Sequence, residues 1–150
     1  MTASPMKRIY FDHSATSRVL PEVFEAMAPF YTERFGNASS LHSFGREAKA
    51  SMELARKHLA ALINAEPGEI VFTSGGTEAD NLAVKGVAAY KGRTKGHILT
   101  TCVEHHAVLE SCAYLKRFGF EVTELPVSKD GIVDPVEAEK ALREDTVLVS

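Results

Sequence analysis

Short runs of β-type residues alternate with helical stretches over the C-terminal half of this chain. The β-type runs cover residues 70–73, 97–101, 120–127 and 146–149, and the helical stretches between them cover residues 78–90, 107–118 and 135–143. Strands that alternate with helices of this length favour parallel β/α units. We therefore predict an α/β fold, with a three-layer, mostly parallel sheet flanked by helices.

The N-terminal part carries helical signals and one short β-type run. Residues 8–11 are typical of a strand or an extended arm. Pro21 opens a helical stretch that Pro29 should stop or kink, and residues 45–65 form a strongly amphipathic pattern. We predict an N-terminal arm over residues 1–20. Residues 21–150 are predicted to form the first part of one large domain.

Composition narrows the possible partners. The net charge is −3 and the sequence pI is about 6.1, so neither nucleic acid nor a membrane surface is an indicated partner. No apolar run approaches the roughly 20 residues of a membrane span, and the N-terminus does not resemble a secretory signal. The two cysteines, Cys102 and Cys112, make no disulfide framework, so a cytoplasmic setting is expected.

The turn Ser74-Gly75-Gly76-Thr77 stands between a predicted strand and a predicted helix. The start of a helix leaves N–H groups unpaired and carries partial positive charge, so it can hold a phosphate. The glycines allow close approach and Thr77 adds a hydroxyl. The alternative is an ordinary capped turn. Neither the Walker A spacing nor the Gly-x-Gly-x-x-Gly pattern is present.

Two histidines, His105 and His106, follow the predicted strand at residues 97–101. Because ligands of open α/β sheets lie at the carboxyl edge of the strands, His105 could stack on an aromatic cofactor or move a proton there. The alternative is a solvated or capping residue. Cys102, His42 and His106 add only a weak metal-binding pattern, so no metal site is predicted. Cys102 and Cys112 are expected to be small core residues.

Taken together, four sequence blocks resemble the cysteine desulfurases, which are fold-type I enzymes of the class V aminotransferase group that depend on pyridoxal phosphate (PLP). The blocks are DHSATS at residues 12–17, GNASSLH at 36–42, FTSGGTEADN at 72–81 and EHHAV at 104–108. Their order and spacing cover nearly all of the chain. The resemblance implies that residues 21–150 are the first part of the PLP-binding large domain.

The resemblance also implies the roles of individual residues. Gly76 and Thr77 would bind the PLP phosphate. His105 would stack on the pyridine ring and assist proton transfer, as a catalytic residue that also binds the cofactor. The family usually has Asn or Tyr after the first Asp of the 12–17 block, whereas this chain has His13. No role is assigned to His13 on the basis of the resemblance.

In the resembled family, L-cysteine is converted to L-alanine and the sulfur becomes a persulfide on an enzyme cysteine, which feeds iron–sulfur cluster or other sulfur-transfer pathways. Cysteine desulfurases are homodimers that bind a sulfur-acceptor or iron–sulfur scaffold protein. The Schiff-base lysine, the aspartate that holds the pyridinium nitrogen and the nucleophilic cysteine lie downstream of residue 150. The chain is therefore expected to be an N-terminal portion, truncated at residue 150 and inactive alone, with Lys85 a solvated side chain.

Three alternatives stay open. The parent protein could be a selenocysteine lyase or another class V aminotransferase. A truncated or split chain could instead act as a non-catalytic binding or assembly partner. An isolated nucleotide-binding module is disfavoured, because the sequence has no nucleotide fingerprint.

Overall fold

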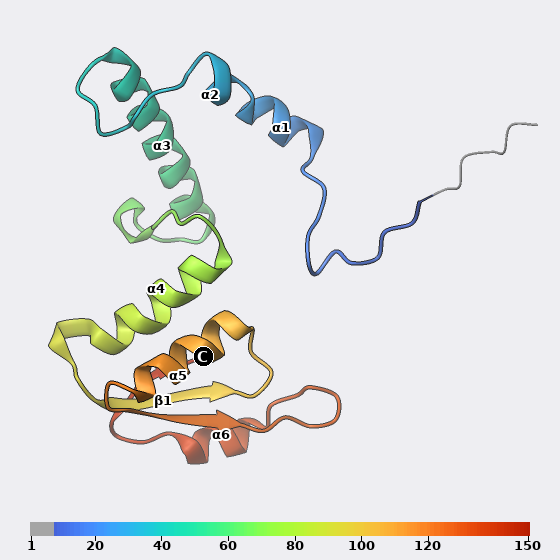
Figure 1. Cartoon of the computed structure of the whole chain (residues 1–150), viewed down its shortest axis with the longest axis vertical. Coiled ribbons are helices and arrows are strands. Elements are labelled where there is room, and N and C mark those ends of the chain that lie inside the picture. The colour runs from blue at the N-terminus through green and yellow to red at the C-terminus, as the bar shows by residue number, and fades with distance from the viewer. Residues whose placement is uncertain (1–7) are drawn as a thin grey trace, which may run out of the picture. The chain divides into compact units, whose positions relative to one another are not determined.

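The computed structural model describes residues 8–150 and divides into two compact units, the first ending at Val71 and the second beginning at Phe72 (Figure 1). In the first unit, residues 8–20 contain neither helix nor strand, so the run at residues 8–11 is not a strand. The helices that follow are α1 (Pro21–Met27), α2 (Pro29–Thr32), α3 (Ser43–Leu62) and the short 3-10 helix η1 (Pro67–Glu69).

Prolines set the boundaries of the first helices. Pro21 is the first residue of α1 and Pro29 is the first residue of α2, positions at which a missing N–H costs no helical hydrogen bond. Ala28 caps the end of α1 through a hydrogen bond from its N–H to the carbonyl of Phe24. The predicted interruption at Pro29 is confirmed.

The loop before α3 packs closely against the start of that helix. The imidazole Nδ1 of His42 caps α3 by accepting a hydrogen bond from the N–H of Gly45 at 3.4 Å. Gly45 is buried, and a Cβ placed there would lie only 2.3 Å from the carbonyl oxygen of Ser40. Glycine is therefore required at this point by close backbone approach.

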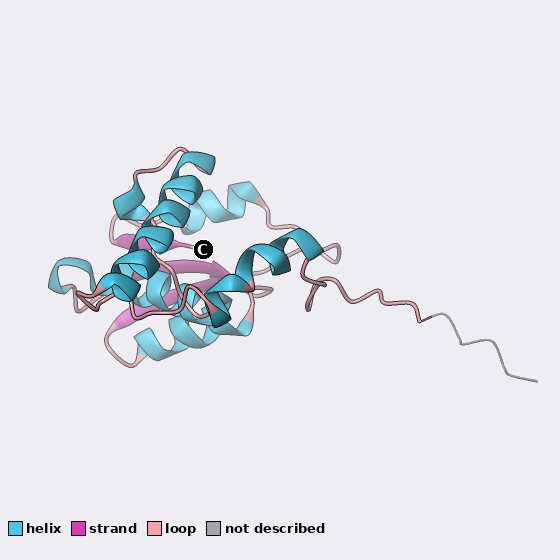
Figure 2. Cartoon of the chain, turned by 90° about the horizontal axis from the view of Figure 1, so that it is seen from above, coloured by secondary structure: helices cyan, strands magenta, loops and turns pink. Residues whose placement is uncertain are grey.

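The second unit is an α/β arrangement. Its elements are α4 (Gly76–Ala89), the 3-10 helix η2 (Tyr90–Gly92), β1 (Gly96–Thr101), α5 (His106–Lys116), β2 (Phe120–Leu125), α6 (Pro135–Ala141) and β3 (Thr146–Val149). The strands lie side by side in the order β2-β1-β3, and both pairings are parallel (Figure 2). The predicted α/β class with a parallel sheet is confirmed.

The chain reverses its direction of travel across this sheet. It passes from β1 through α5 to β2 on one side, and then through α6 to β3 on the other side of β1. Right-handed crossovers in opposite directions put their helices on opposite faces of a sheet. Figure 1 shows this result, with α4 and α5 on one face and α6 on the other, which makes three layers.

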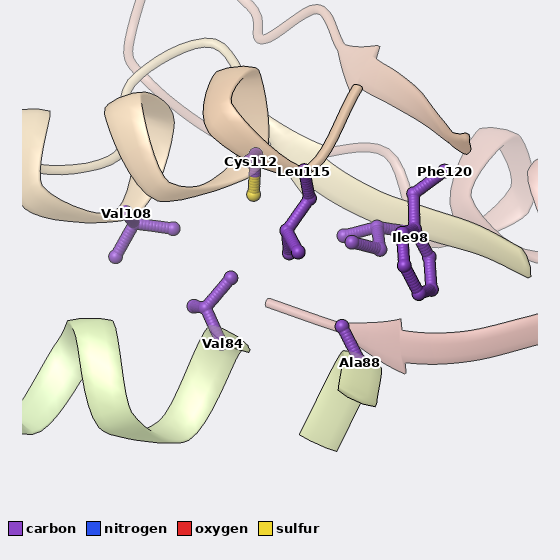
Figure 3. Packing of buried hydrophobic residues seen from close by; sticks show 7 residues of the cluster. All are labelled: Val84, Ala88, Ile98, Val108, Cys112, Leu115 and Phe120. Carbon is purple, nitrogen blue, oxygen red and sulfur yellow. The ribbon is translucent and has the colours of Figure 1, made fainter. Parts of the chain in front are cut away.

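The main core lies between the α4–α5 pair and the sheet (Figure 3). It is formed by apolar side chains from two helices and two strands: Val84, Ala88, Ile98, Val108, Cys112, Leu115 and Phe120. Burial of these side chains fixes α4 and α5 against the strands, at roughly 25 cal/mol for each Å² of apolar surface removed from water.

A buried histidine connects the three strands. His97 of β1 has no exposed surface, its Nδ1 lies 2.9 Å from Thr146 Oγ1 on β3, and its Nε2 lies 2.8 Å from Thr123 Oγ1 on β2. Each ring nitrogen therefore has a hydroxyl partner on a flanking strand. The polar ring costs little to bury because both nitrogens are hydrogen-bonded.

The predicted strand at residues 70–73 is wrong. Ile70 has an extended backbone (φ −90°, ψ 123°), but residues 70–73 pair with no strand among the described residues. The carbonyl of Ile70 accepts a hydrogen bond from the Arg56 side chain instead. A β-type run becomes a strand only when a neighbouring strand supplies hydrogen bonds, and local composition does not reveal that neighbour.

The close approach at Gly45 leads to a first prediction. Alanine normally favours a helix interior over glycine by about 1 kcal/mol. At Gly45 the added Cβ must displace the loop, so Gly45→Ala should accelerate hydrogen exchange of the first-turn amides of α3. Gly86→Ala in α4 is the matched control, since a Cβ there meets nothing within 4 Å and should slow exchange in α4. Slower exchange in α3 of Gly45→Ala would contradict the close approach.

The histidine between the strands leads to a second prediction. His97→Leu fills the space of the imidazole with an apolar side chain and removes the hydrogen-bond partner of the Thr123 hydroxyl. We expect the free energy of unfolding to fall by about 1–3 kcal/mol, the cost of an unpaired buried polar group. Urea denaturation measures it. Ile98→Val is the control for mild repacking, with an expected loss of about 0.5–1.5 kcal/mol. Full stability of His97→Leu would show that the ring bonds contribute nothing.

Candidate functional site

Helix α4 begins inside the predicted phosphate turn. Gly76 is its first residue, Thr77 its second, and Gly75 stands at the cap position, where no side chain caps the helix. A Cβ built on Gly75 or Gly76 would meet nothing within 4 Å, so the approach to the helix start is open. Uncapped N–H groups, an adjacent threonine hydroxyl and open space are the features that an anion site needs.

Hydrogen bonds behind the helix start hold the turn. The N–H and the hydroxyl of Ser74 both donate to Glu78 Oε2, each at 2.7 Å, and Thr73 Oγ1 lies 3.1 Å from the Gly75 carbonyl. The bond from the Ser74 N–H, followed by the bond from its hydroxyl, holds the pKa of the exposed Glu78 carboxyl below its ordinary value. Because this pKa is depressed on folding, the stabilisation is present at neutral pH and is lost as the pH falls through the folded-state pKa.

His105 is the N-cap of α5. Its Nδ1 accepts a hydrogen bond from the N–H of Ala107 at 3.0 Å, so the capping interpretation left open by the sequence describes its contact in this structure. An accepting Nδ1 carries no proton, which places the proton of the neutral ring on Nε2. His106 is the first helical residue, and the two imidazole centroids lie 6.4 Å apart.

The starts of α4 and α5 lie at the same edge of the sheet. Lys85 Nζ lies 4.6 Å from the centroid of the Tyr114 ring, and these residues follow Gly76 and His105 by nine positions each (85 − 76 and 114 − 105). Nine residues rise about 13.5 Å along a helix, so the two starts are level with each other. Figure 1 shows both at the end where β1 and β2 finish.

This edge is the expected place for a ligand in such a sheet. The loop after β1 leads directly into His105, and β1 is the strand at which the chain changes direction across the sheet. Open α/β sheets bind ligands beyond the carboxyl ends of their strands at this kind of reversal. The structure thus brings the Gly76–Thr77 helix start and His105 to one edge.

Lys85 differs from the prediction of a solvated side chain. It is half-buried, and its ammonium group donates to Asn81 Oδ1 at 2.5 Å while it lies over the Tyr114 ring. Asn81 Nδ2 in turn donates to the carbonyl of Thr77 at 2.8 Å. The spacing of four residues along one helix face is the signal that could have revealed this chain of contacts.

The cysteine predictions are half confirmed. Cys112 is buried in the core, and burial raises the pKa of its thiol. Cys102 is exposed, contrary to expectation, and lies in the turn that follows β1. The described residues contain no group of three or more His, Cys, Asp or Glu side chains placed to hold a metal ion.

One polar atom near this edge has no partner. The Thr100 hydroxyl, one residue before the end of β1, is fully buried and accepts or donates no hydrogen bond among residues 8–150. A surface hollow of about 940 Å³ lies elsewhere, at the amino end of the strands, and is lined by residues that include Lys95, Glu121 and Asp145. None of the predicted site residues lines it.

Residues 9–150 match the aminotransferase class-V family along almost the whole chain. The chain belongs to this family. It is 55% identical over 147 residues to the cysteine desulfurase IscS of Dictyoglomus turgidum, a match that covers 97% of this chain and 37% of that relative. The chain thus spans little more than a third of the length of the curated relatives that it matches.

Solved structures confirm the fold class. A NifS-like protein superimposes with a TM-score of 0.88 at 45% identity, over 95% of this chain and 39% of that protein. The protein SspA in complex with cysteine gives a TM-score of 0.86 at 38% identity, over 93% of this chain and 40% of that protein. These neighbours have the fold-type I architecture. No helix within residues 8–150 has both the length and the apolar character that crossing a membrane requires.

The two possible roles of His105 can be separated by substitution. His105→Asn keeps a side-chain acceptor for the Ala107 N–H and removes the ring, whereas His105→Ala removes both. We expect His105→Ala to lower the free energy of unfolding by about 1 kcal/mol and His105→Asn to lower it by a few tenths. Urea denaturation compares the variants. Equal losses for Asn and Ala would contradict the capping contact.

Proposed function

We propose that the protein to which this chain belongs is a PLP-dependent cysteine desulfurase, converting L-cysteine to L-alanine and passing the sulfur to an enzyme cysteine as a persulfide. The observation that carries the proposal is the open, uncapped start of α4 at Gly76 and Thr77, at the same sheet edge as His105. The relatives named cysteine desulfurase and the neighbour solved with cysteine support the substrate.

The residues of this helix start fit the phosphate of PLP. A phosphate ester needs several N–H donors and positive potential without a bulky side chain in the way. The uncapped start of α4, the open space at Gly75 and Gly76, and the Thr77 hydroxyl meet those needs. Gly76 and Thr77 would hold the phosphate, and His105 would lie against the ring. PLP, when bound, supplies an electron sink for the chemistry at the substrate carbon.

The chain's own residues then act by binding and orientation. The start of α4 offsets the negative charge of the phosphate and fixes that end of the cofactor. The Ala107 N–H holds His105 Nδ1, so the imidazole keeps one orientation and carries its proton on Nε2. The Nε2–H group is therefore the hydrogen-bond donor that the ring can direct to the site. The helix cap thereby sets both the position of the ring and the place of its proton.

The proposal extends to the setting of the whole protein. We infer a cytoplasmic homodimer that passes sulfur to an acceptor or an iron–sulfur scaffold protein. Association is supported by large apolar side chains that stay exposed in both units, among them Phe24, Tyr31 and Phe72. Free cysteines at positions 102 and 112 agree with a reducing setting.

A threonine substitution tests the phosphate site. In the protein at the length of its relatives, Thr77→Val should weaken PLP binding about ten- to one-hundred-fold, the range expected for a hydrogen bond to a charged group. Absorbance titration of the apo protein measures affinity, and alanine and sulfide formation from L-cysteine measures activity. Thr94→Val, an exposed threonine at the opposite edge of the sheet, is the control and should bind normally.

Two outcomes would overturn the proposal. The first is a wild-type protein that binds PLP but forms no alanine from L-cysteine, whatever its activity with L-selenocysteine. The second is a Thr77→Val variant with unchanged affinity for PLP, which would remove the phosphate from the start of α4.

A further inference from the structure

The start of α4 is stabilised in an unusual way. A glycine at the cap position has no side chain to accept from the first helical N–H groups, and Gly75 leaves them uncapped. In a capping box, a glutamate at the third helical position bonds the N–H of the cap residue. Here Glu78, the third residue of α4, reaches one residue further back and accepts from the N–H and the hydroxyl of Ser74.

This contact separates the donors of the turn into two groups. Both donors of Ser74 are directed to Glu78 Oε2 at 2.7 Å. The N–H groups at Gly76 and Thr77 receive no capping side chain and remain available. The Glu78 carboxylate therefore binds the two donors of Ser74 and leaves the N–H groups of Gly76 and Thr77 available.

Other contacts hold the remaining parts of the turn. The Thr73 hydroxyl donates to the Gly75 carbonyl at 3.1 Å before the helix begins. On the helix side, Asn81 Nδ2 bonds the Thr77 carbonyl at 2.8 Å and is itself held by Lys85. Ser74 is the one residue of the turn whose N–H and hydroxyl are both held by a single side chain, that of Glu78, in this part of the structure.

A carboxylate so near a phosphate also has an opposing effect. Like charges repel, so on charge alone Glu78 would weaken the binding of a phosphate ester. Its hydrogen bonds act in the other direction, because they hold the backbone of the turn in the shape that exposes the free N–H groups. Removal of the carboxylate should therefore weaken phosphate binding if geometry dominates and strengthen it if charge dominates. A glutamine has the same length without the charge, so it separates the two effects.

We propose that Glu78 is a positioning residue for the phosphate end of the cofactor: it fixes Ser74 so that the turn presents the N–H groups of Gly76 and Thr77 to a phosphate ester. The inference rests on the proposed function, since it deepens the same site. Glu78 acts through Ser74 and touches no reacting atom.

The experiment compares Glu78→Ala with Glu78→Gln in the apo form of the full-length protein. Glutamine keeps an oxygen that can accept both Ser74 bonds and removes the charge. We expect Glu78→Ala to bind PLP at least ten-fold more weakly than wild type, and Glu78→Gln to stay within about three-fold of wild type. Pyridoxal, which lacks the phosphate, should bind all three proteins with similar affinity.

The chain offers a matched control at the same helix position. Glu137 is the third residue of α6, is exposed, and pairs with Lys140 at 2.8 Å without reaching back to the start of its helix. Glu137→Ala and Glu137→Gln should leave the affinities for PLP and pyridoxal unchanged.

A second readout needs no ligand. Hydrogen exchange of the Ser74 amide should be at least ten-fold faster in Glu78→Ala than in wild type and close to wild type in Glu78→Gln. Because Glu78 is exposed, these variants should retain the fold, which exchange of the β1 amides checks directly.

Each outcome has one meaning. If Glu78→Ala binds PLP as tightly as wild type, or if both Glu78 variants bind it more tightly, the positioning role is overturned. Loss of PLP affinity in Glu78→Ala together with an equal loss for pyridoxal would also overturn it, since the effect would not concern the phosphate. If wild type shows no preference for PLP over pyridoxal, the phosphate site itself fails, and the proposed function fails with it.

Discussion

The burial of β1 between two parallel neighbours is the constraint on which the second unit depends. Ile98 and Leu99 point to opposite faces of the sheet and both are buried, so β1 needs cover on each face. The chain supplies that cover by crossing first through α5 and then through α6. The same two crossovers create the reversal beside β1 at which His105 lies, so the placement of the candidate site follows from the burial of one strand.

His97 adds specificity to that strand. Apolar packing tolerates small shifts of a strand, whereas a ring with one bond to Thr146 and another to Thr123 fits only one alignment of β3, β1 and β2. The irregularity in the pairing of β1 with β3 falls directly after His97. The histidine thus keeps the three strands aligned where the regular ladder is interrupted.

Much of the fold could be predicted from local signals. The helical stretch predicted from residue 135 begins at that residue as α6, and the Asp134 side chain caps it by accepting a hydrogen bond from the N–H of Val136. The strand at residues 146–149 was predicted with its correct limits. Such features depend on caps, prolines and short apolar runs, which act within a few residues.

What could not be predicted depends on partners distant in the sequence. The run at residues 70–73 has the composition of a strand but no strand beside it, and Cys102 has the character of a core residue but lies where the chain leaves the sheet. The ammonium group of Lys85 in α4 lies over the ring of Tyr114 in α5. At the candidate site, the motif located Gly76, Thr77 and His105, and their roles stay predictions. The motif does not reveal the two hydrogen bonds from Ser74 to Glu78, because a motif names residues and not the bonds between them.

Helix capping and chemistry are linked at this site. A histidine can cap a helix only through a nitrogen that carries no proton, so the bond from the Ala107 N–H to His105 Nδ1 determines which nitrogen is left for a proton. At α4 the relation is reversed, since Gly75 provides no cap and the unpaired N–H groups stay available for an anion. Two helix starts at one sheet edge therefore differ in whether a side chain caps them. That difference makes one of them suited to hold a phosphate and the other suited to orient an imidazole.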